Sequence, residues 1–247
     1  MKVTPLKTKR IEVLSADISK ILSEALDHIA ENSVLAVTSK ILSLSEGRVV
    51  RPEECGRDDV IEQEADLFLP KGGNKYNVYL TIKNNMLIPN AGVDESNSGG
   101  YYIRWPKDPQ ASAEYCWRFL RAHFHVKNVG VIVTDSTDTP LKWGVSGVCI
   151  AHCGFDGIND KIGSLDLFGR ELRMTKINVA GALAAAAVLC MGETDEQTPL
   201  ALIEDIPFVR FRDAPPTERE LAAANIDLCD DLFGQLLSSA PWQRGKK

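Results

Sequence analysis

The sequence has 247 residues, of which 44% are hydrophobic and 25% charged. This composition is typical of a globular protein and excludes a disordered, fibrous or disulfide-framework chain. A chain of this length buries roughly 70% of the surface that its unfolded form exposes, so it folds without help from metals or disulfides. Its 28 Lys and Arg against 34 Asp and Glu give a net charge of −6, which repels polyphosphate backbones and argues against nucleic acid as a partner.

The N-terminus gives no sign of export. Residues 1–5 lack the apolar core of a signal peptide, and the longest run of small apolar residues, 179–191, is too short to span a bilayer. We therefore expect a cytoplasmic protein with no membrane partner. The six cysteines are scattered along the chain, and reduced thiols are expected for all of them.

Hydrophobic periodicity and turn-forming residues predict the elements of the N-terminal half. Ile18, Leu22 and Ile29 share one helical face, which predicts an amphipathic helix. Asn84 and Asn85 tolerate left-handed backbone angles, which predicts a tight hairpin turn. In chain order, the expected elements are an extended segment at 3–6, a helix at 15–30, strands at 34–37 and 47–50, a helical end to 52–66, a loop at 70–74, and strands at 78–82 and 86–89.

The C-terminal half shows stronger signals. Asp108 and Pro109 form a good helix start, and Thr217 with Glu220 matches a capping box. Every position of 129–133 is apolar, as in a strand covered on both faces. The expected elements are a helix at 108–125, strands at 128–134 and 144–150, an alanine-rich helix at 175–191 and a helix at 217–237.

No repeat or long linker divides the chain, so residues 1–247 are expected to form one catalytic domain, or two interlocked subdomains. Residues 213–247 are expected to be a C-terminal helical segment with a short basic tail. Alternating strands and helices with at least one hairpin favour an α+β fold with a mixed sheet over a doubly wound one.

Common signatures of nucleotide binding and nucleophilic catalysis are absent. The sequence has no G-x-x-x-x-G-K-[ST] phosphate loop, no G-x-G-x-x-G motif after a strand, and no G-x-S-x-G elbow. Any phosphate chemistry must therefore be organised in another way.

Three acidic segments, 90–97, 134–138 and 191–196, occur where apolar elements end. Their carboxylate and hydroxyl oxygens are the ligands that magnesium and manganese prefer. If Asp94, Asp135 and Glu193 converge, their mutual repulsion calls for a divalent cation, which could bridge phosphate oxygens. Taken alone, each segment is more typical of a turn than of a site, because Asn, Asp, Ser and Gly are turn formers.

Two other kinds of site compete with this interpretation. Cys149, His152 and Cys153, with His123 and His125 nearby, could form a zinc site of a structural or redox module, although their spacing matches no standard zinc pattern. A hydrolase using Ser136 or Ser146 with His152 is weaker, because the sequence supplies no oxyanion loop.

Five separated motifs resemble those of a known family. They lie between Val34 and Ile203 and are Thr38-Ser-Lys with Ser45-Glu-Gly-Arg48, Asn90-Ala-Gly-Val-Asp-Glu-Ser-Asn97, Val131-Ile-Val-Thr-Asp-Ser136, Asp166-Leu-Phe-Gly-Arg-Glu-Leu172, and Met191-Gly-Glu193 with Thr198-Pro199. In these motifs the chain is similar to the coenzyme F-420:L-glutamate ligase family, the gamma-glutamyl ligases of the deazaflavin coenzyme.

The resemblance implies the α+β ligase fold of that family, with mixed and antiparallel sheets, flanking helices and an intertwined homodimer. It also implies an enzyme that joins the amine of L-glutamate to a coenzyme carboxylate through an acyl phosphate. Such an enzyme consumes GTP or ATP and uses magnesium or manganese. A folate-type acceptor is the alternative within the same family.

The resemblance also assigns site residues. Asp94 and Asp135 are implied to hold one metal ion, and Ser136 and Glu193 to help hold a second. Arg170 is the best candidate to dock an anionic substrate. The residues implied to contact the nucleotide are Ser39, Lys40, Asn97, Gly192, Thr194 and Thr198.

The chain departs from the family pattern at several positions. The family usually has lysine at Leu44, a Gly-Arg pair at Asp138-Thr139, an acidic pair at Gly181-Ala182 and glycine at Gln197. These departures leave the metal carboxylates intact. They bear on nucleotide preference and on the acceptor, which no other sequence feature decides.

Overall fold

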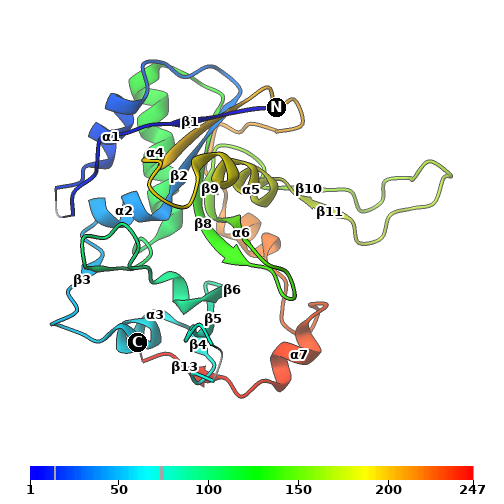
Figure 1. Ribbon diagram of the computed structural model, residues 1–247. Helices are drawn as coiled ribbons and strands as arrows, with labels where there is room; N and C mark the ends of the chain where they lie inside the picture. The colour runs from blue at the N-terminus through cyan, green and yellow to red at the C-terminus, as the bar shows by residue number, and fades with distance from the viewer. Residues whose placement is uncertain (14, 73–74, 247) are drawn as a thin grey trace.

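The computed structural model describes residues 1–13, 15–72 and 75–246. Its centre is a five-stranded sheet in the order β1-β12-β2-β8-β9 (Figure 1). Strands β2 and β8 are parallel, and the other neighbouring pairs are antiparallel. The strands are β1 Lys2–Leu6, β12 Leu200–Glu204, β2 Ser33–Thr38, β8 Val129–Asp138 and β9 Val145–Cys153.

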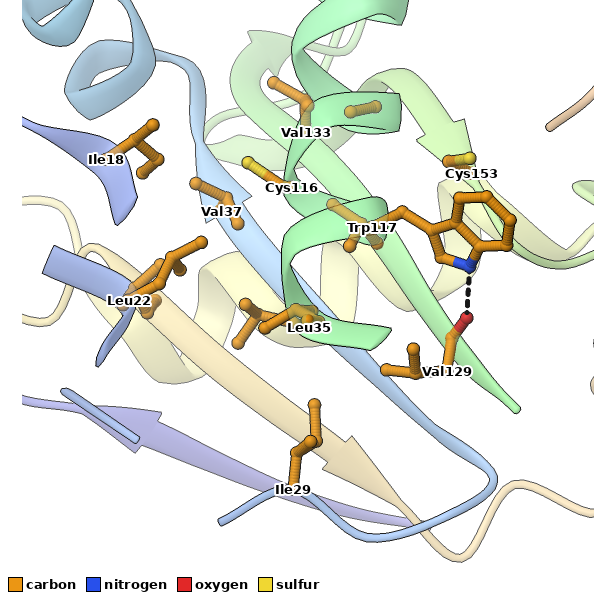
Figure 2. Close-up of a cluster of buried hydrophobic side chains, with 14 of the residues drawn as sticks. Ile18, Leu22, Ile29, Leu35, Val37, Cys116, Trp117, Val129, Val133 and Cys153 are labelled. Atoms are coloured by element: carbon orange, nitrogen blue, oxygen red, sulfur yellow. Dashed lines mark hydrogen bonds between the residues drawn. The ribbon is translucent and has the colours of Figure 1, made fainter. Parts of the chain in front are cut away.

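Helices cover both faces of this sheet. Helices α1 (Ile18–Ala25) and α4 (Pro109–Phe124) pack on one face, and α5 (Val179–Met191) packs on the other. In β8, Val131 and Val133 belong to the first core and Ile132 to the second, which confirms the strand expected to be covered on both sides. In the first core, shown in Figure 2, the buried Trp117 indole donates a hydrogen bond to the Val129 carbonyl oxygen (2.9 Å).

A smaller sheet, in the order β13-β4-β5-β6, forms a third core with helix α3. The predicted hairpin turn is present, since Asn84 and Asn85 have φ values of 50° and 59°. A two-stranded pair, β3-β7, and the short helices α2 and η1 link this part to the central sheet. The bounds are α2 Ser39–Ser45, β3 Val49–Val50, α3 Arg57–Glu64, β4 Leu67–Phe68, β5 Leu80–Lys83, β6 Met86–Pro89, η1 Asn90–Gly92, β7 Tyr102–Ile103 and β13 Gln243–Arg244.

Several predicted boundaries were wrong. The helix expected over 15–30 ends at Ala25, although Ile29 beyond it is still buried in the first core. The helix expected over 217–237 is two short helices, α6 (Glu218–Ala224) and α7 (Gly234–Ser239), because the chain turns extended at Asn225. The capping box at Thr217 is confirmed. Of the loop expected at 70–74, residues 73 and 74 lie outside the described residues.

In two places the structure has a strand where we expected something else, once a loop and once a helical turn. β8 continues to Asp138 and pairs with β9 along its extra length, so Asp135 and Ser136 lie on a strand and not on the loop that we expected. The alanine-rich helix begins at residue 179, since the residues before it form β11 (Lys176–Asn178), which pairs with β10 (Ile158–Asp160).

The segment between β10 and β11 projects away from the body of the molecule as a long arm (Figure 1). We call residues 161–175 the arm. Two of its apolar side chains are almost fully exposed, with exposed fractions of 99% for Leu167 and 97% for Phe168. Within the described part of the chain, no helix is both long and apolar enough to cross a membrane.

Candidate functional site

A cavity of about 490 Å³ lies where β2 and β8 end. Because these two strands are parallel, their carboxyl ends meet at one edge of the sheet. The loop before β7, the N-terminal stretch 8–13 and the residues that follow α5 complete the wall. The lining residues predicted from the sequence are Lys40, Asp94, Asn97, Asp135, Ser136, Gly192, Glu193, Thr194 and Thr198.

Asp94 lies at the edge of this cavity in a positively charged setting. The Lys40 ammonium is 2.7 Å from its carboxylate, and Ser96 donates two hydrogen bonds to it, from the backbone N–H and from the hydroxyl, each of 2.8 Å. Burial acts to raise the pKa of Asp94, but the charge of Lys40 and these hydrogen bonds outweigh it, and the pKa is lowered. Asp94 is therefore ionised at neutral pH.

Asp135, on β8, has the opposite electrostatic setting. Burial, reinforced by the negative charge of Asp94, raises the pKa of Asp135 to about 6. Hydrogen bonds from the Trp105 indole N–H and from the Ser136 backbone N–H (2.9 Å) offset only part of this cost. The cavity thus contains a carboxylate that lacks a full counter-charge, which a bound cation could supply.

Glu193 follows the end of α5, in a loop that folds back on itself. Gly192 ends the helix at a φ of 82°, and Glu196 accepts a hydrogen bond from the Thr194 backbone N–H (2.8 Å). The Asn97 amide donates to the Thr194 carbonyl oxygen (2.7 Å), which ties the loop to the Asp94 segment. Burial raises the pKa of Glu193.

Two predicted site residues lie outside this cavity. Ser39 is buried beneath it, where its carbonyl oxygen accepts the Ser43 hydroxyl (2.9 Å), and Thr38 lines the wall instead. Arg170 is exposed on the arm, with its backbone N–H bonded to Asp166. Within one chain, the fold does not bring Arg170 to the carboxylates.

The carboxylate and hydroxyl oxygens that line the cavity are the kind of ligand that a hard divalent cation prefers. In the described ranges, no group of three or more His, Cys, Asp or Glu side chains is close enough to hold a metal ion by itself. Magnesium, however, is usually held by one or two carboxylates together with substrate phosphates and water, and it needs no complete protein cage. Asp94 and Asp135 are two carboxylates that line the same cavity.

The competing sites are not assembled. Cys153 belongs to the core on one face of β9, whereas Cys149 packs against the core on the other face, and no metal-binding group forms there among the described residues. The zinc interpretation was therefore wrong. The hydrolase interpretation was also wrong, because His152 packs on Phe155 beside a separate cavity that does not include Ser136.

The sequence analysis did not predict two parts of the site. Trp105 bonds to a carboxylate 30 positions away along the chain, and no spacing rule signals such a pair. The stretch 8–13 reaches the cavity because Thr8 donates its N–H to the Gln197 carbonyl oxygen (3.0 Å).

The residues that depart from the family pattern lie in different parts of the structure. Leu44 is buried and gives the cavity an apolar wall. Gln197 has a φ of 56°, a backbone conformation in which glycine is favoured, so the usual glycine is understandable there. Gly181 and Ala182 lie in the first turn of α5, away from the cavity, and Asp138 is exposed at the end of β8.

The α+β fold contains a cavity lined by carboxylates and a lysine, and carboxylates with shifted pKa values in a cavity are typical of an enzyme site. The sequence comparisons make this assignment specific. Residues 6–205 match the model of the F420-0:gamma-glutamyl ligase family. The coenzyme F420:L-glutamate ligase of Methanopyrus kandleri is 33% identical over 224 residues, covering 83% of this chain and 87% of the relative.

Two other relatives have the same enzyme name and similar identities. The enzyme of the same name from Methanococcus maripaludis strain C7 is 33% identical, with 87% of this chain and 82% of the relative covered. That from Methanothermobacter thermautotrophicus is 30% identical, with 77% and 82% covered. The chain therefore belongs to the F420-0:gamma-glutamyl ligase family, and it is an amide-bond-forming ligase.

Proposed function

We propose that this ligase adds L-glutamate to a carboxylate of a coenzyme of the F-420 type, using a nucleoside triphosphate and a divalent metal ion. Family membership supports the acceptor and the amino acid. The observation that carries the proposal for nucleotide and metal is that Asp94, Asp135 and Glu193, which are distant in sequence, line one cavity beside Lys40.

The reaction needs activation because a free carboxylate is a poor acyl donor. In the proposed route, an acceptor carboxylate oxygen attacks the terminal phosphorus of the nucleotide, and the nucleoside diphosphate leaves. The deprotonated amine of glutamate then attacks the acyl carbon, a C–N bond forms, and the C–O bond to phosphate breaks. Since cells hold these nucleotides in the cytoplasm, we expect the enzyme there.

The residues contribute mainly charge and position. Asp94 and Asp135 would hold a first ion, and Ser136 and Glu193 would help to hold a second. A bound magnesium or manganese ion supplies charge neutralisation for phosphoryl transfer. Lys40, which is already held at the cavity by Asp94 and Ser96, would contact phosphate oxygens, while Asn97, Thr194 and Thr198 position the nucleotide from the loop side.

Calorimetric titration of GTP and of ATP, each with Mn²⁺ or Mg²⁺, tests the site. Asp94→Ala or Asp135→Ala should abolish measurable metal-dependent nucleotide binding, because each removes a charged ligand from a shared pocket. Asp27→Ala is the matched control, since Asp27 is an exposed acidic residue that does not line the cavity. Binding that survives both cavity substitutions would remove the proposed site.

The acceptor requires a separate experiment. Purified enzyme, glutamate and nucleotide are incubated with a panel of carboxylate acceptors of deazaflavin and folate type, and mass spectrometry detects the addition of a glutamyl residue. A glutamylated deazaflavin is the expected product. If only the folate is glutamylated, the proposed acceptor is wrong, but the proposed ligase activity stands.

We also propose that two copies of the chain associate through the arm. Leu165, Leu167, Phe168 and Met174 expose large apolar side chains on one short segment, and concentrated exposed apolar surface marks an interaction site. An arm that crosses to a second copy would also move Arg170 toward the partner's surface, which explains why the fold of one chain leaves it isolated.

A further inference from the structure

Trp105 is the one large aromatic side chain whose polar atom bonds directly to a carboxylate lining the cavity in the described structure. It lies just after β7 and is 1% exposed. Its indole N–H donates to one oxygen of Asp135, while the Ser136 backbone N–H donates to the other oxygen (2.9 Å). These two bonds, from different directions, fix the plane of the carboxylate and leave its remaining lone pairs for a ligand.

The indole itself is held tightly in place. Gly92 lies against it at a φ of 71°, and a Cβ at this position would overlap the indole ring. No other residue type combines that backbone conformation with so close an approach. The Trp105 carbonyl oxygen accepts a hydrogen bond from the Arg48 guanidinium (3.0 Å). The ring is thus constrained at its face and at its backbone.

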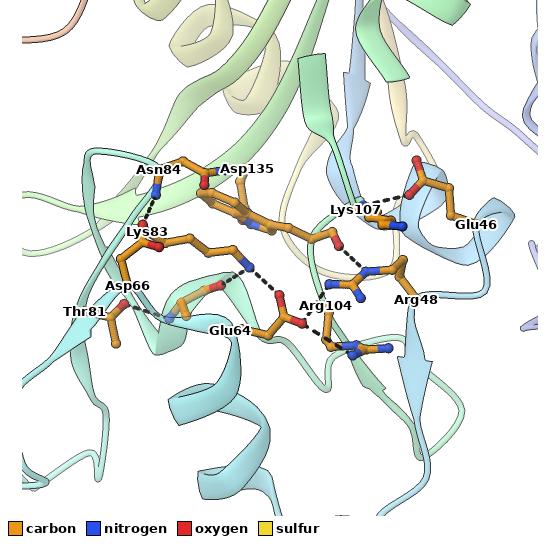
Figure 3. A network of polar contacts seen from close by, with 12 residues as sticks. Glu46, Arg48, Glu64, Asp66, Thr81, Lys83, Asn84, Arg104, Lys107 and Asp135 are labelled. Carbon is orange, nitrogen blue, oxygen red and sulfur yellow. Dashed lines mark hydrogen bonds and ion pairs between the residues drawn. The ribbon is translucent and has the colours of Figure 1, made fainter. Parts of the chain in front are cut away.

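A buried ion network lies behind the ring. The Lys83 ammonium is 5.0 Å from the centre of the Trp105 ring and 2.7 Å from Glu64. Glu64 also binds Arg48 (2.7 Å) and Arg104 (3.4 Å), as Figure 3 shows. A cation over an indole is attracted to its π face, and it draws electron density from the ring, which makes the N–H a better donor.

A purely structural tryptophan needs some acceptor for its N–H when it is buried, as Trp117 finds in a backbone carbonyl. Trp105 differs because its acceptor is a group that lines the cavity. The network that holds the ring comes from Glu64 at the end of α3, Lys83 at the end of β5 and Arg48 just before β3. The arrangement connects the smaller sheet to the site through one side chain.

We infer that Trp105 is a positioning residue that orients the carboxylate of Asp135 for its ligand, and that the Lys83–Glu64 pair holds the indole in the required place. This inference rests on the proposed function, in which Asp135 binds the metal–nucleotide complex. It adds to the site a positioning residue that lies outside the acidic motifs of the sequence.

The test compares Trp105→Phe with Trp117→Phe. Both variants keep a buried ring and lose an indole N–H, but only the first loses a bond to Asp135. Calorimetry with Mn²⁺ and GTP should show affinity about tenfold weaker in Trp105→Phe, because a hydrogen bond to a charged group is lost. Trp117→Phe should retain wild-type affinity although it unfolds at lower urea concentration.

A spectroscopic readout separates positioning from structural support. The indole N–H signal of Trp105 in a ¹H–¹⁵N spectrum, assigned by its loss in Trp105→Phe, should move when Mg²⁺ and GTP are added, whereas the Trp117 signal should not. Lys83→Met provides a second variant if Trp105→Phe does not fold. It leaves the cavity untouched and should weaken affinity by several-fold.

Asp135→Asn, measured in parallel, distinguishes the two proposals. If Asp135→Asn abolishes binding and folded Trp105→Phe or Lys83→Met binds as the wild type does, the positioning role is overturned and the proposed function stands. Unchanged binding in Asp135→Asn overturns both. Equal weakening in Trp105→Phe and Trp117→Phe reduces Trp105 to a structural residue and also overturns the inference.

Discussion

At the scale of single residues, the two aspartates of the cavity differ in charge because their neighbours differ. Asp94 is compensated by Lys40 and by the Ser96 donors, and its pKa is lowered. Asp135 is deeper, has neutral donors, and has a raised pKa. Asp94 is therefore ionised without a bound cation, whereas ionising Asp135 opposes folding unless a cation is bound.

Replacement of Asp135 by Asn should stabilise the metal-free protein at pH 8. Because the pKa of Asp135 is about 6 in the folded state and 3.8 ordinarily, the folded state binds the proton more tightly. The stability contributed by this group is therefore lost as pH rises between these values. We expect Asp135→Asn to unfold with a free energy about 1–2 kcal/mol higher at pH 8, after allowance for the loss of one hydrogen bond, since the asparagine NH2 cannot accept from an N–H as the carboxylate oxygen does, and with no gain below pH 4.

Urea unfolding in the presence of a chelator measures this difference. Asp138→Asn, an exposed change on the same strand, should be neutral at both pH values. An Asp135→Asn protein that is equally destabilised at pH 8 and pH 4 would show that the ionised carboxylate carries no folding cost.

Metal and nucleotide affinity should fall in acid for the same reason. As pH drops through about 6, Asp135 gains a proton and loses the charge that attracts a cation. Calorimetry at pH 7.5 and pH 5.5 should therefore show weaker Mn²⁺–GTP binding at the lower pH. Affinity that does not change across this range would exclude Asp135 as a ligand whose ionisation matters.

The sequence predicted that three short acidic motifs, at the ends of strands and helices, would come together, and Asp94, Asp135 and Glu193 do line one cavity. Each motif was recognisable because carboxylates in a turn-rich segment are a local signal. Trp105 was not, since its role depends on a contact across 30 positions. Arg170 had the right chemistry, but its place on a projecting arm depends on tertiary structure that motif order does not reveal.

At the scale of elements, the alanine-rich helix α5 allows β9 to approach its backbone closely. A Cβ on Gly147 of β9 would overlap the Ala184 carbonyl oxygen and the Val188 side chain. The small side chains of the alanine-rich helix leave room for this neighbour. The boundary at residue 179 was not predictable, since pairing with β10 converts the preceding residues from an expected helical turn to a strand.

Gly147→Ala should therefore separate β9 from α5. The overlap involves backbone and a β-branched side chain, so we expect a loss of about 1–3 kcal/mol in the free energy of unfolding. Because α5 ends at the loop that carries Glu193, nucleotide affinity should fall as well. Ser146→Ala, an exposed change at the adjacent position, should alter neither quantity in urea unfolding or calorimetry, and a neutral Gly147→Ala would show that the helix can move away freely.

At the scale of the whole molecule, segments that are distant in sequence meet around one cavity. The central sheet contributes Asp135, the segment after η1 contributes Asp94, and the loop after α5 contributes Glu193. The smaller sheet reaches the same place through Lys83 and Trp105. The strand β13, near the C-terminus, extends that sheet by pairing with β4, whereas the arm projects from the body of the molecule (Figure 1).

The arm leads to a prediction about assembly. Replacing Leu167 and Phe168 by Asp places two charges on side chains that are 99% and 97% exposed, so the isolated chain should fold as before. If the arm joins two copies, these charges must be buried at the interface, which is unfavourable, and light scattering after gel filtration should show a dimer for the wild type and a monomer for the variant. Leu232→Asp, at a side chain that is 90% exposed on the C-terminal segment, should remain dimeric. A monomeric wild type, or a double variant that stays dimeric, would assign the exposed apolar arm to some other contact and would leave Arg170 outside the site.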